Sequence, residues 1–201
     1  MNYFKKIVYT VVFSLFSLLL INPVQAWAQK NSATIKQLLQ ERDSQIKELM
    51  GPEETKLSQQ KRDELKNIVN NIIDYREMAK KALGNTYDEL SESERDEFVD
   101  LFSTLVRDHS LQNLDIYRAE VNYKNIDVNG DVASVKTMAQ LEDVRTPVGY
   151  TMLYENGEWV VTDMIIDDVS TVDSYNRQFQ RIIRKKGYDA LLNNLRKKAA
   201  G

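Results

Sequence analysis

The sequence predicts an α+β fold in which an antiparallel four-strand meander packs against a layer of helices. Three observations support this prediction. Residues 32–106 carry apolar side chains at helical spacing, residues 121–166 form β-rich runs around two Asn-Gly pairs, and residues 172–195 return to helical spacing. Helices that precede and follow a run of strands are typical of helices packed on an antiparallel sheet.

The chain opens with a segment typical of a secretory signal peptide. Two lysines precede an apolar run over residues 7–21, and Ala26-Trp27-Ala28 forms a small-x-small cleavage site. The apolar run is shorter than the ~20 residues that span a bilayer, which disfavours the alternative of an uncleaved membrane anchor. We therefore expect a signal peptide over residues 1–28 and a single exported domain over residues 29–201.

Composition argues against several classes of function. The 201-residue chain has no cysteine, one histidine, 27 basic and 30 acidic residues. Removal of residues 1–28 takes away two lysines and no acid, so the mature net charge is about −5, which does not suit nucleic-acid binding. An exported domain without disulfides depends on its hydrophobic core, and about 170 residues are enough to form one.

Three helices are expected before the strands. The first covers residues 32–50 and is stopped by Gly51-Pro52. The second is a long helix from near Ser58 to Gly84. The third begins at Ser91, and a glutamate three residues later completes a capping box.

The first hairpin is expected between residues 121–128 and 132–141, which flank the turn signal Asn129-Gly130. The apolar residues at the two ends of the first run are out of phase with each other. A bulge near Lys124-Asn125 would bring them onto one face of the sheet.

The second hairpin is expected to turn at Asn156-Gly157, and a two-residue turn there pairs Tyr150 with Asp163. One face would then carry Val148, Tyr150, Met152, Tyr154, Trp159, Val161 and Ile165. The other would carry Leu153, Val160, Met164 and Ile166, and apolar residues on both faces predict that both are covered. Spacing alone favours core packing, although Tyr, Met and Trp also suit the wall of an apolar ligand site. Glu155 opposite Glu158 is a mildly unfavourable pair, so a longer loop with exchanged faces is also open.

A helix is expected after the sheet, with Val172, Tyr175, Phe179, Ile182 and Ile183 on its apolar face. A short helix with Leu191, Leu192 and Leu195 follows Gly187. The first of these helices also carries the basic residues Arg177, Arg181, Arg184 and Lys185. Their simplest interpretation is a solvated face, and the functional hypothesis is electrostatic docking to an acidic partner or to anionic headgroups.

Catalysis has little support in the sequence. There is no cysteine and no Gly-rich phosphate loop, and His109 is the only histidine, so a His-rich metal site is excluded. Asp163, Asp167 and Asp168 are close together, but acids at a strand end commonly begin turns and cap helices. We therefore expect neither an enzyme nor a cofactor or bound metal ion.

Several short motifs occur together in this chain. They are Asp74-Tyr75, Met78-Ala79, Leu83-Gly84, Tyr87, Phe98, Phe102, Pro147-Val148, Tyr150, Trp159, residues 163–166, Val169-Ser170, Lys186-Gly187, Leu191 and Leu195. With the signal peptide, their order and spacing resemble the periplasmic phospholipid-binding component of the Mla pathway, also called the toluene-tolerance auxiliary family of ABC transporters. The resemblance covers almost all of the mature chain. Two positions depart from the family: it usually has Gly where Asp168 stands and often Trp where Tyr87 stands.

The resemblance implies a monomeric periplasmic carrier that holds phospholipid tails as cargo in an apolar cavity between its sheet and its helices. It also implies two partners, an outer-membrane lipoprotein complex and an inner-membrane ABC transporter with an MCE-domain subunit. The implied tail contacts are Tyr75, Met78, Leu83, Phe98, Leu101, Phe102, Leu105, Tyr150, Met152, Trp159, Val161, Met164 and Ile166. Two other hypotheses are a binding protein for another apolar ligand, such as a hopanoid or quinone, and a structural envelope protein with a filled core.

Overall fold

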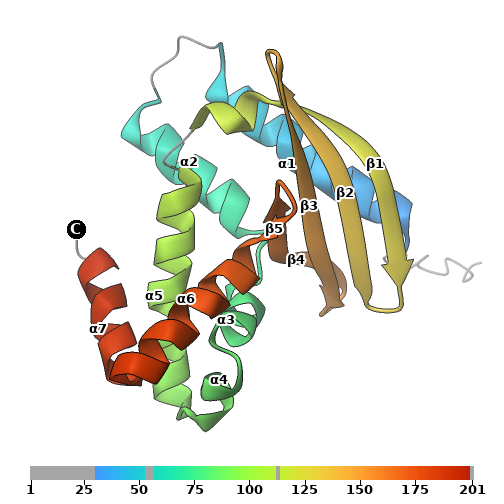
Figure 1. The fold of residues 1–201 in the computed structure, drawn as a ribbon. Helices are drawn as coiled ribbons and strands as arrows, with labels where there is room; N and C mark the ends of the chain where they lie inside the picture. The colour runs from blue at the N-terminus through green and yellow to red at the C-terminus, as the bar shows by residue number, and fades with distance from the viewer. Residues whose placement is uncertain (1–29, 53–56, 112–113, 200–201) are drawn as a thin grey trace, which may run out of the picture.

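The structure, a computed structural model, describes residues 30–52, 57–111 and 114–199 (Figure 1). The expected signal peptide and its cleavage site lie outside these residues. Before the sheet come the helices α1 (Ser32–Met50), α2 (Gln59–Asn70), α3 (Tyr75–Leu83), α4 (Asn85–Glu89), α5 (Glu92–Leu111) and the 3-10 helix η1 (Leu114–Arg118). The strands are β1 (Glu120–Asn129), β2 (Val132–Leu141), β3 (Val144–Glu155), β4 (Glu158–Ile166) and β5 (Val169–Ser170), and they are followed by α6 (Thr171–Lys186) and α7 (Tyr188–Ala199).

The strands form one antiparallel sheet in the order β1-β2-β3-β4-β5. The predicted α+β meander is therefore confirmed, but the predicted number of four strands is one too few. The additional strand, β5, pairs with the end of β4 after a tight turn at Asp167-Asp168. Both aspartates adopt the left-handed backbone conformation, with φ of 51° and 61°. Asp is one of the few residues other than Gly that adopt this conformation. Asp168 thus tolerates the backbone conformation for which glycine is best suited.

The two long hairpins agree closely with the turns and bulge predicted from the sequence, except that one turn is shifted. The bulge near Lys124-Asn125 is confirmed, because the register of β1 against β2 shifts between Tyr123 and Asn125. The predicted position of the first turn is wrong by one residue, because Asn129 pairs with Val132. The turn residues are therefore 130 and 131, and the glycine comes first, with a φ of 63°. The turn at Asn156-Gly157 is confirmed, with φ of 53° and 93°.

A second bulge, in β4, changes the faces predicted for the last hairpin. Met152 pairs with Val161 as predicted, but Tyr150 pairs with Met164 instead of Asp163. Thr162 is the extra residue. Its hydroxyl donates to the carbonyl of Thr151 at 3.4 Å and accepts a hydrogen bond from Lys81 Nζ at 3.0 Å. Because one extra residue reverses the alternation, Met164 and Ile166 lie on the face of Tyr150, and Ile165 lies on the other.

Only one face of the sheet is covered along its length. On the other face Val132 is 49% exposed, and Ser134 and Lys136 are also exposed. The prediction that both faces are covered concerned β3 and β4, where Leu153, Val160 and Ile165 on this face are half-buried, so it holds only in part. Leu153 and Val160 pair with each other on the partly exposed face, where cross-strand contacts between apolar side chains still stabilise the sheet.

The single long helix predicted from Ser58 to Gly84 is two helices. Between them the chain joins the edge of β4: Val161 N donates to the carbonyl of Ile72 at 2.7 Å, and Asp74 N donates to the carbonyl of Val161 at 2.9 Å. Asp74 then caps α3, since its Oδ1 accepts a hydrogen bond from Glu77 N at 2.9 Å. The helix breaks here because its backbone bonds are exchanged for sheet bonds.

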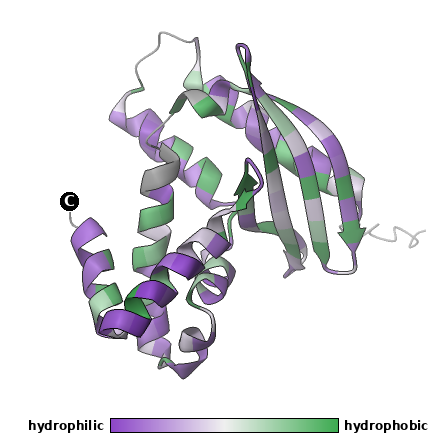
Figure 2. Ribbon diagram, viewed as in Figure 1, coloured by the Kyte–Doolittle hydropathy of each residue, from purple (hydrophilic) through white to green (hydrophobic). Residues whose placement is uncertain are grey.

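The helices α3, α5, α6 and α7 pack together beside the sheet, around an aromatic cluster (Figure 1). Phe102 lies at its centre, with ring centroids 5.9 Å from Phe98, 5.2 Å from Tyr175 and 5.9 Å from Phe179. In Figure 2 hydrophobic turns of α5 lie inside this group, whereas much of α6 and α7 is hydrophilic. The capping box of α5 is confirmed, because Glu94 Oε2 accepts from the amide of Ser91 at 2.9 Å.

Two smaller hydrophobic clusters complete the core. In the first, Ile35 and Leu39 of α1 cover Val135, Met152 and Trp159 on one face of the sheet. In the second, the end of α1 packs against α2 through Met50, Leu57 and Leu65. Within the described ranges, no helix is both long and apolar enough to cross a membrane.

Candidate ligand-binding cavity

An apolar cavity of about 320 Å³ lies between the sheet and the helices α1, α2 and η1. Its volume falls at the lower end of the range of ~300–1,000 Å³ found for small-molecule sites. The structure thus contains a cavity between sheet and helices, of the kind that the resemblance implies.

The sheet wall of the cavity depends on the two bulges. Its residues come from the covered face of four strands: Val121, Tyr123, Thr137, Ala139, Val148, Tyr150, Val161, Met164 and Ile166. In the register, Tyr123 pairs with Thr137, which pairs with Val148, which pairs with Ile166, so these four side chains form one row across the sheet. Without the bulge at Thr162, Met164 and Ile166 would point to the opposite face.

The helical wall is mostly aliphatic. It consists of Leu39, Arg42, Asp43, Ile46, Ile68, Val69, Ile72, Ile73, Ile116, Tyr117 and Ala119. Ile72 and Ile73 belong to the segment that joins β4, so the break between α2 and α3 brings them to the cavity. Ile116 and Ile166 are 41% and 39% exposed, and they mark where the cavity meets solvent.

Two charged side chains, Arg42 and Asp43, also border the cavity, and both already have partners on α1. Asp43 accepts a hydrogen bond from Lys47 Nζ at 2.8 Å, and Arg42 Nη1 donates to Gln45 Oε1 at 3.0 Å. The charges are therefore held on the helix and leave most of the wall apolar.

Two tyrosines of the wall, Tyr123 and Tyr150, keep their protons. Burial, together with the charge of Asp43, raises the pKa of Tyr150 to about 12. Burial, with Tyr150 and Asp43, also raises the pKa of Tyr123. Near neutral pH both phenol groups are therefore hydrogen-bond donors.

The structure divides the predicted tail contacts into three groups. Tyr150, Val161, Met164 and Ile166 line the cavity. Met152 and Trp159 lie farther along the same face, where α1 covers them and leaves them 0% and 4% exposed. The other seven lie in or against the helical cluster around Phe102 and are not brought to the cavity: Tyr75, Met78, Leu83, Phe98, Leu101, Phe102 and Leu105. Which of the thirteen contact a ligand stays a prediction.

Several residues of the cavity wall are absent from the predicted set. Ile72 and Ile73 look like ordinary helix core unless the helix is broken after Asn70. The sequence does carry a signal for that break, since Asp74 followed by Glu77 is a helix N-terminus pattern. Tyr123 could be assigned to the cavity face of the sheet only by taking the bulge beside it into account.

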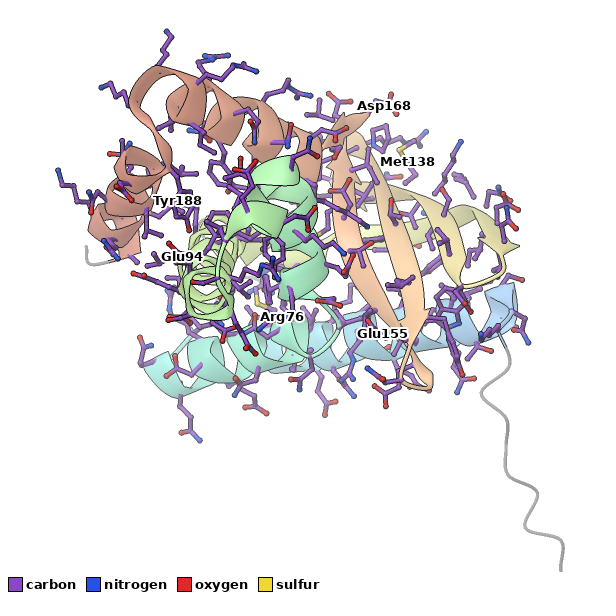
Figure 3. All side chains as sticks on the ribbon, turned by 90° about the horizontal axis from the view of Figure 1, so that it is seen from below. Arg76, Glu94, Met138, Glu155, Asp168 and Tyr188 are labelled. Atoms are coloured by element: carbon purple, nitrogen blue, oxygen red, sulfur yellow. The ribbon has the colours of Figure 1, made fainter. Side chains whose placement is uncertain are left out.

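The three clustered aspartates have structural roles. Asp163 Oδ2 accepts from the hydroxyl of Ser170 at 2.6 Å, and its Oδ1 accepts from the amide of Val172 at 3.0 Å, so it holds the start of α6. Asp167 and Asp168 form the turn before β5. Figure 3 shows Asp168 near Met138 at one end of the sheet and Glu155 at the opposite end.

The basic residues proposed for docking lie on α6. Arg177, Arg181, Arg184 and Lys185 are exposed, and none of them has a salt bridge with another described residue. In the described part of the chain, no group of three or more His, Asp or Glu side chains is placed to hold a metal ion.

These features define a class: a small α+β domain with one covered sheet face and an apolar cavity beneath helices. Residues 29–197 match the sequence model of the family described as MlaC protein, so this chain belongs to the MlaC family.

A solved structure has a similar fold. It is a phospholipid-binding protein from Ralstonia solanacearum in complex with a phospholipid, and it superposes with a TM-score of 0.72 at 19% sequence identity. The match covers 86% of this chain and 98% of that one. A search of curated proteins finds no match.

Proposed function

We propose that this protein is a periplasmic phospholipid carrier that encloses acyl chains reversibly, without covalent chemistry. The observation that carries the proposal is the 320 Å³ cavity with its mostly aliphatic wall. Membership of the MlaC family and the similar fold of a phospholipid-binding protein support it. In this proposal the carrier moves lipid between an outer-membrane lipoprotein complex and an inner-membrane ABC transporter.

Apolar burial accounts for both binding and release. Each methylene group removed from water is stabilised by ~0.8 kcal/mol, so the cavity keeps an acyl chain out of the aqueous periplasm. The interior of a bilayer is as apolar as this wall, and transfer between the two is therefore nearly neutral in free energy. A carrier needs this balance, because it must take up lipid from one membrane complex and release it to another.

The proposal is tested by native mass spectrometry of the purified protein. We expect a co-purified diacyl phospholipid at close to one molecule per chain. Another bound lipid would instead favour a carrier for a different apolar ligand, such as a hopanoid or quinone. A ligand-free protein that extracts nothing from phospholipid vesicles would contradict the proposal and favour a structural envelope protein.

We further propose that the basic face of α6 docks the carrier onto its membrane partners. The support is four exposed basic side chains on one helix of an otherwise acidic protein. Changing Arg181, Arg184 and Lys185 to Glu should slow lipid transfer to vesicles that carry the transporter complex by roughly tenfold at low salt, because electrostatic steering of association is lost. The amount of bound lipid should not change.

A matched control tests whether position matters. Lys124, Lys136 and Arg145 are exposed on the sheet, and changing these three to Glu alters the net charge equally. The control should transfer lipid at close to the normal rate. Unchanged transfer by the α6 variant, or equal loss in both variants, would contradict docking through α6.

A further inference from the structure

Two tyrosines of the cavity wall have hydroxyl groups without a hydrogen-bond partner among the described residues. They are Tyr123 and Tyr150. Tyr75, outside the cavity, shows the usual arrangement, since its hydroxyl donates to Asn70 Oδ1 at 2.8 Å. A phenol group that lines an apolar cavity without a protein partner is a donor open to a bound molecule.

Both hydroxyls are reachable from inside the cavity. The hydroxyl of Tyr188 and Nε1 of Trp159 also lack partners, but those atoms are sealed within the protein. Tyr150 is half-buried and borders the cavity, so its donor is open to a bound molecule. In a shielded site of low dielectric, a hydrogen bond is stronger than in water.

The two donors are arranged as a pair. Tyr123 is on β1 and Tyr150 is on β3, on the same face of the sheet and one row apart in the register. The carboxylate of Asp43, on the helix above them, acts electrostatically on both phenol groups. Asp43 is itself paired with Lys47, whose Nζ donates to its carboxylate at 2.8 Å, and Arg42 also borders the cavity, so the charges here nearly balance. A neutral oxygen acceptor therefore suits these two donors.

We propose that Tyr123 and Tyr150 donate hydrogen bonds to the two ester carbonyl oxygens of a diacyl lipid. This inference rests on the proposed carrier function and adds which part of the lipid is recognised. An ester carbonyl is neutral and only accepts hydrogen bonds, which matches protonated phenol groups beside a carboxylate. The aliphatic wall formed by Ile68, Val69 and Ile72 takes the chains that extend from the esters.

The test compares ester and ether lipids. Protein freed of lipid is incubated with vesicles that contain equal amounts of a diacyl phosphatidylethanolamine and its dialkyl ether analogue of equal chain length. Native mass spectrometry then gives the ratio of the two bound lipids. Two hydrogen bonds that the ether cannot replace predict a preference for the ester of roughly five- to thirtyfold.

Variants assign this preference to the two hydroxyls. The double variant Tyr123→Phe and Tyr150→Phe keeps the rings, and we expect its ratio of ester to ether lipid to fall close to one while total bound lipid stays substantial. Tyr154→Phe is the matched control, since Tyr154 is on β3 and packs against Trp159 outside the cavity, and its ratio should equal that of the unmodified protein.

The outcomes separate this inference from the proposed function. A ratio near one in the unmodified protein, or an unchanged preference in the double variant, would overturn the ester contacts and leave the carrier function standing. Failure of the unmodified protein to bind either lipid would overturn both.

Discussion

Replacing Ala139 with Phe should empty the cavity of lipid and leave the fold intact. Ala139 lies on β2 in the sheet wall, and its methyl group points at the void beneath α1 and η1. A phenyl ring built there occupies space that is unfilled in the protein, so it competes directly with an acyl chain. We expect bound phospholipid, measured by mass spectrometry after purification, to fall at least tenfold, with no loss of melting temperature.

Ala133 provides the matched control for this experiment. It lies on the same strand and the same face, but it is 1% exposed and packs in the cluster beneath Ile35 and Leu39. Its replacement with Phe overpacks a filled core and should cost ~1–3 kcal/mol of unfolding free energy, while the folded fraction keeps its lipid. Full lipid content in the Ala139 variant would show that the 320 Å³ cavity is not the lipid site.

Truncation of Phe102 to Ala should produce the largest loss of stability among the predicted changes. Its ring is 0% exposed and contacts three other aromatic rings from α5 and α6. Loss of a buried Phe from such a site costs ~3–5 kcal/mol, which for a domain of this size lowers the melting temperature by roughly 6–20 °C. Thermal and denaturant unfolding followed by circular dichroism measure this change.

The same variant decides what Phe102 does. The resemblance implies that it contacts acyl chains, whereas the structure places it in the helical cluster. If Phe102 is a core residue, the folded Phe102→Ala variant keeps its bound lipid. Val144→Ala is the control for stability: this side chain is 65% exposed, so its truncation should change the unfolding free energy by less than ~0.5 kcal/mol. A stable Phe102→Ala protein that has lost its lipid would restore Phe102 to the binding site.

The elements that the sequence predicts correctly have local signals. The first helix is bounded by residues whose conformation depends on near neighbours: Asn31 Oδ1 accepts from the amide of Thr34 at 2.9 Å, and Gly51 ends the helix at a φ of 64°. The capping box of α5 and the turn at Asn156-Gly157 are local in the same sense. Such patterns decide a structure with little help from the rest of the fold.

The errors concern features that depend on distant contacts. Residues 158–166 suit a strand in either register, and only the polar contacts of Thr162 with Lys81 and Thr151 reveal which residue is extra. The break after α2 likewise depends on the edge of β4, about ninety residues later in the chain. Both errors bear on the site, because they determine the positions of Ile72 and Met164.

The cavity itself has no signature in the pattern of hydrophobic residues. Ala133 and Ala139 occupy equivalent positions on the covered face of β2, yet one is sealed and the other borders a void. The difference lies in which part of α1 passes above them. Periodicity shows that a face is covered, and only the three-dimensional path of the covering helix shows where a space is left.

The bulge in β1 has another effect, at the border of the sheet. β1 is a terminal strand, so the amide and carbonyl groups along its outer side lack a neighbouring strand, a situation that invites pairing between molecules. The irregular backbone after Tyr123, with Lys124 exposed beside it, interrupts that template. Residues 72–74 and β5 occupy the outer side of β4. Neither border of the described sheet thus presents a long regular edge, which protects a protein with a single covered sheet face against aggregation through strand addition.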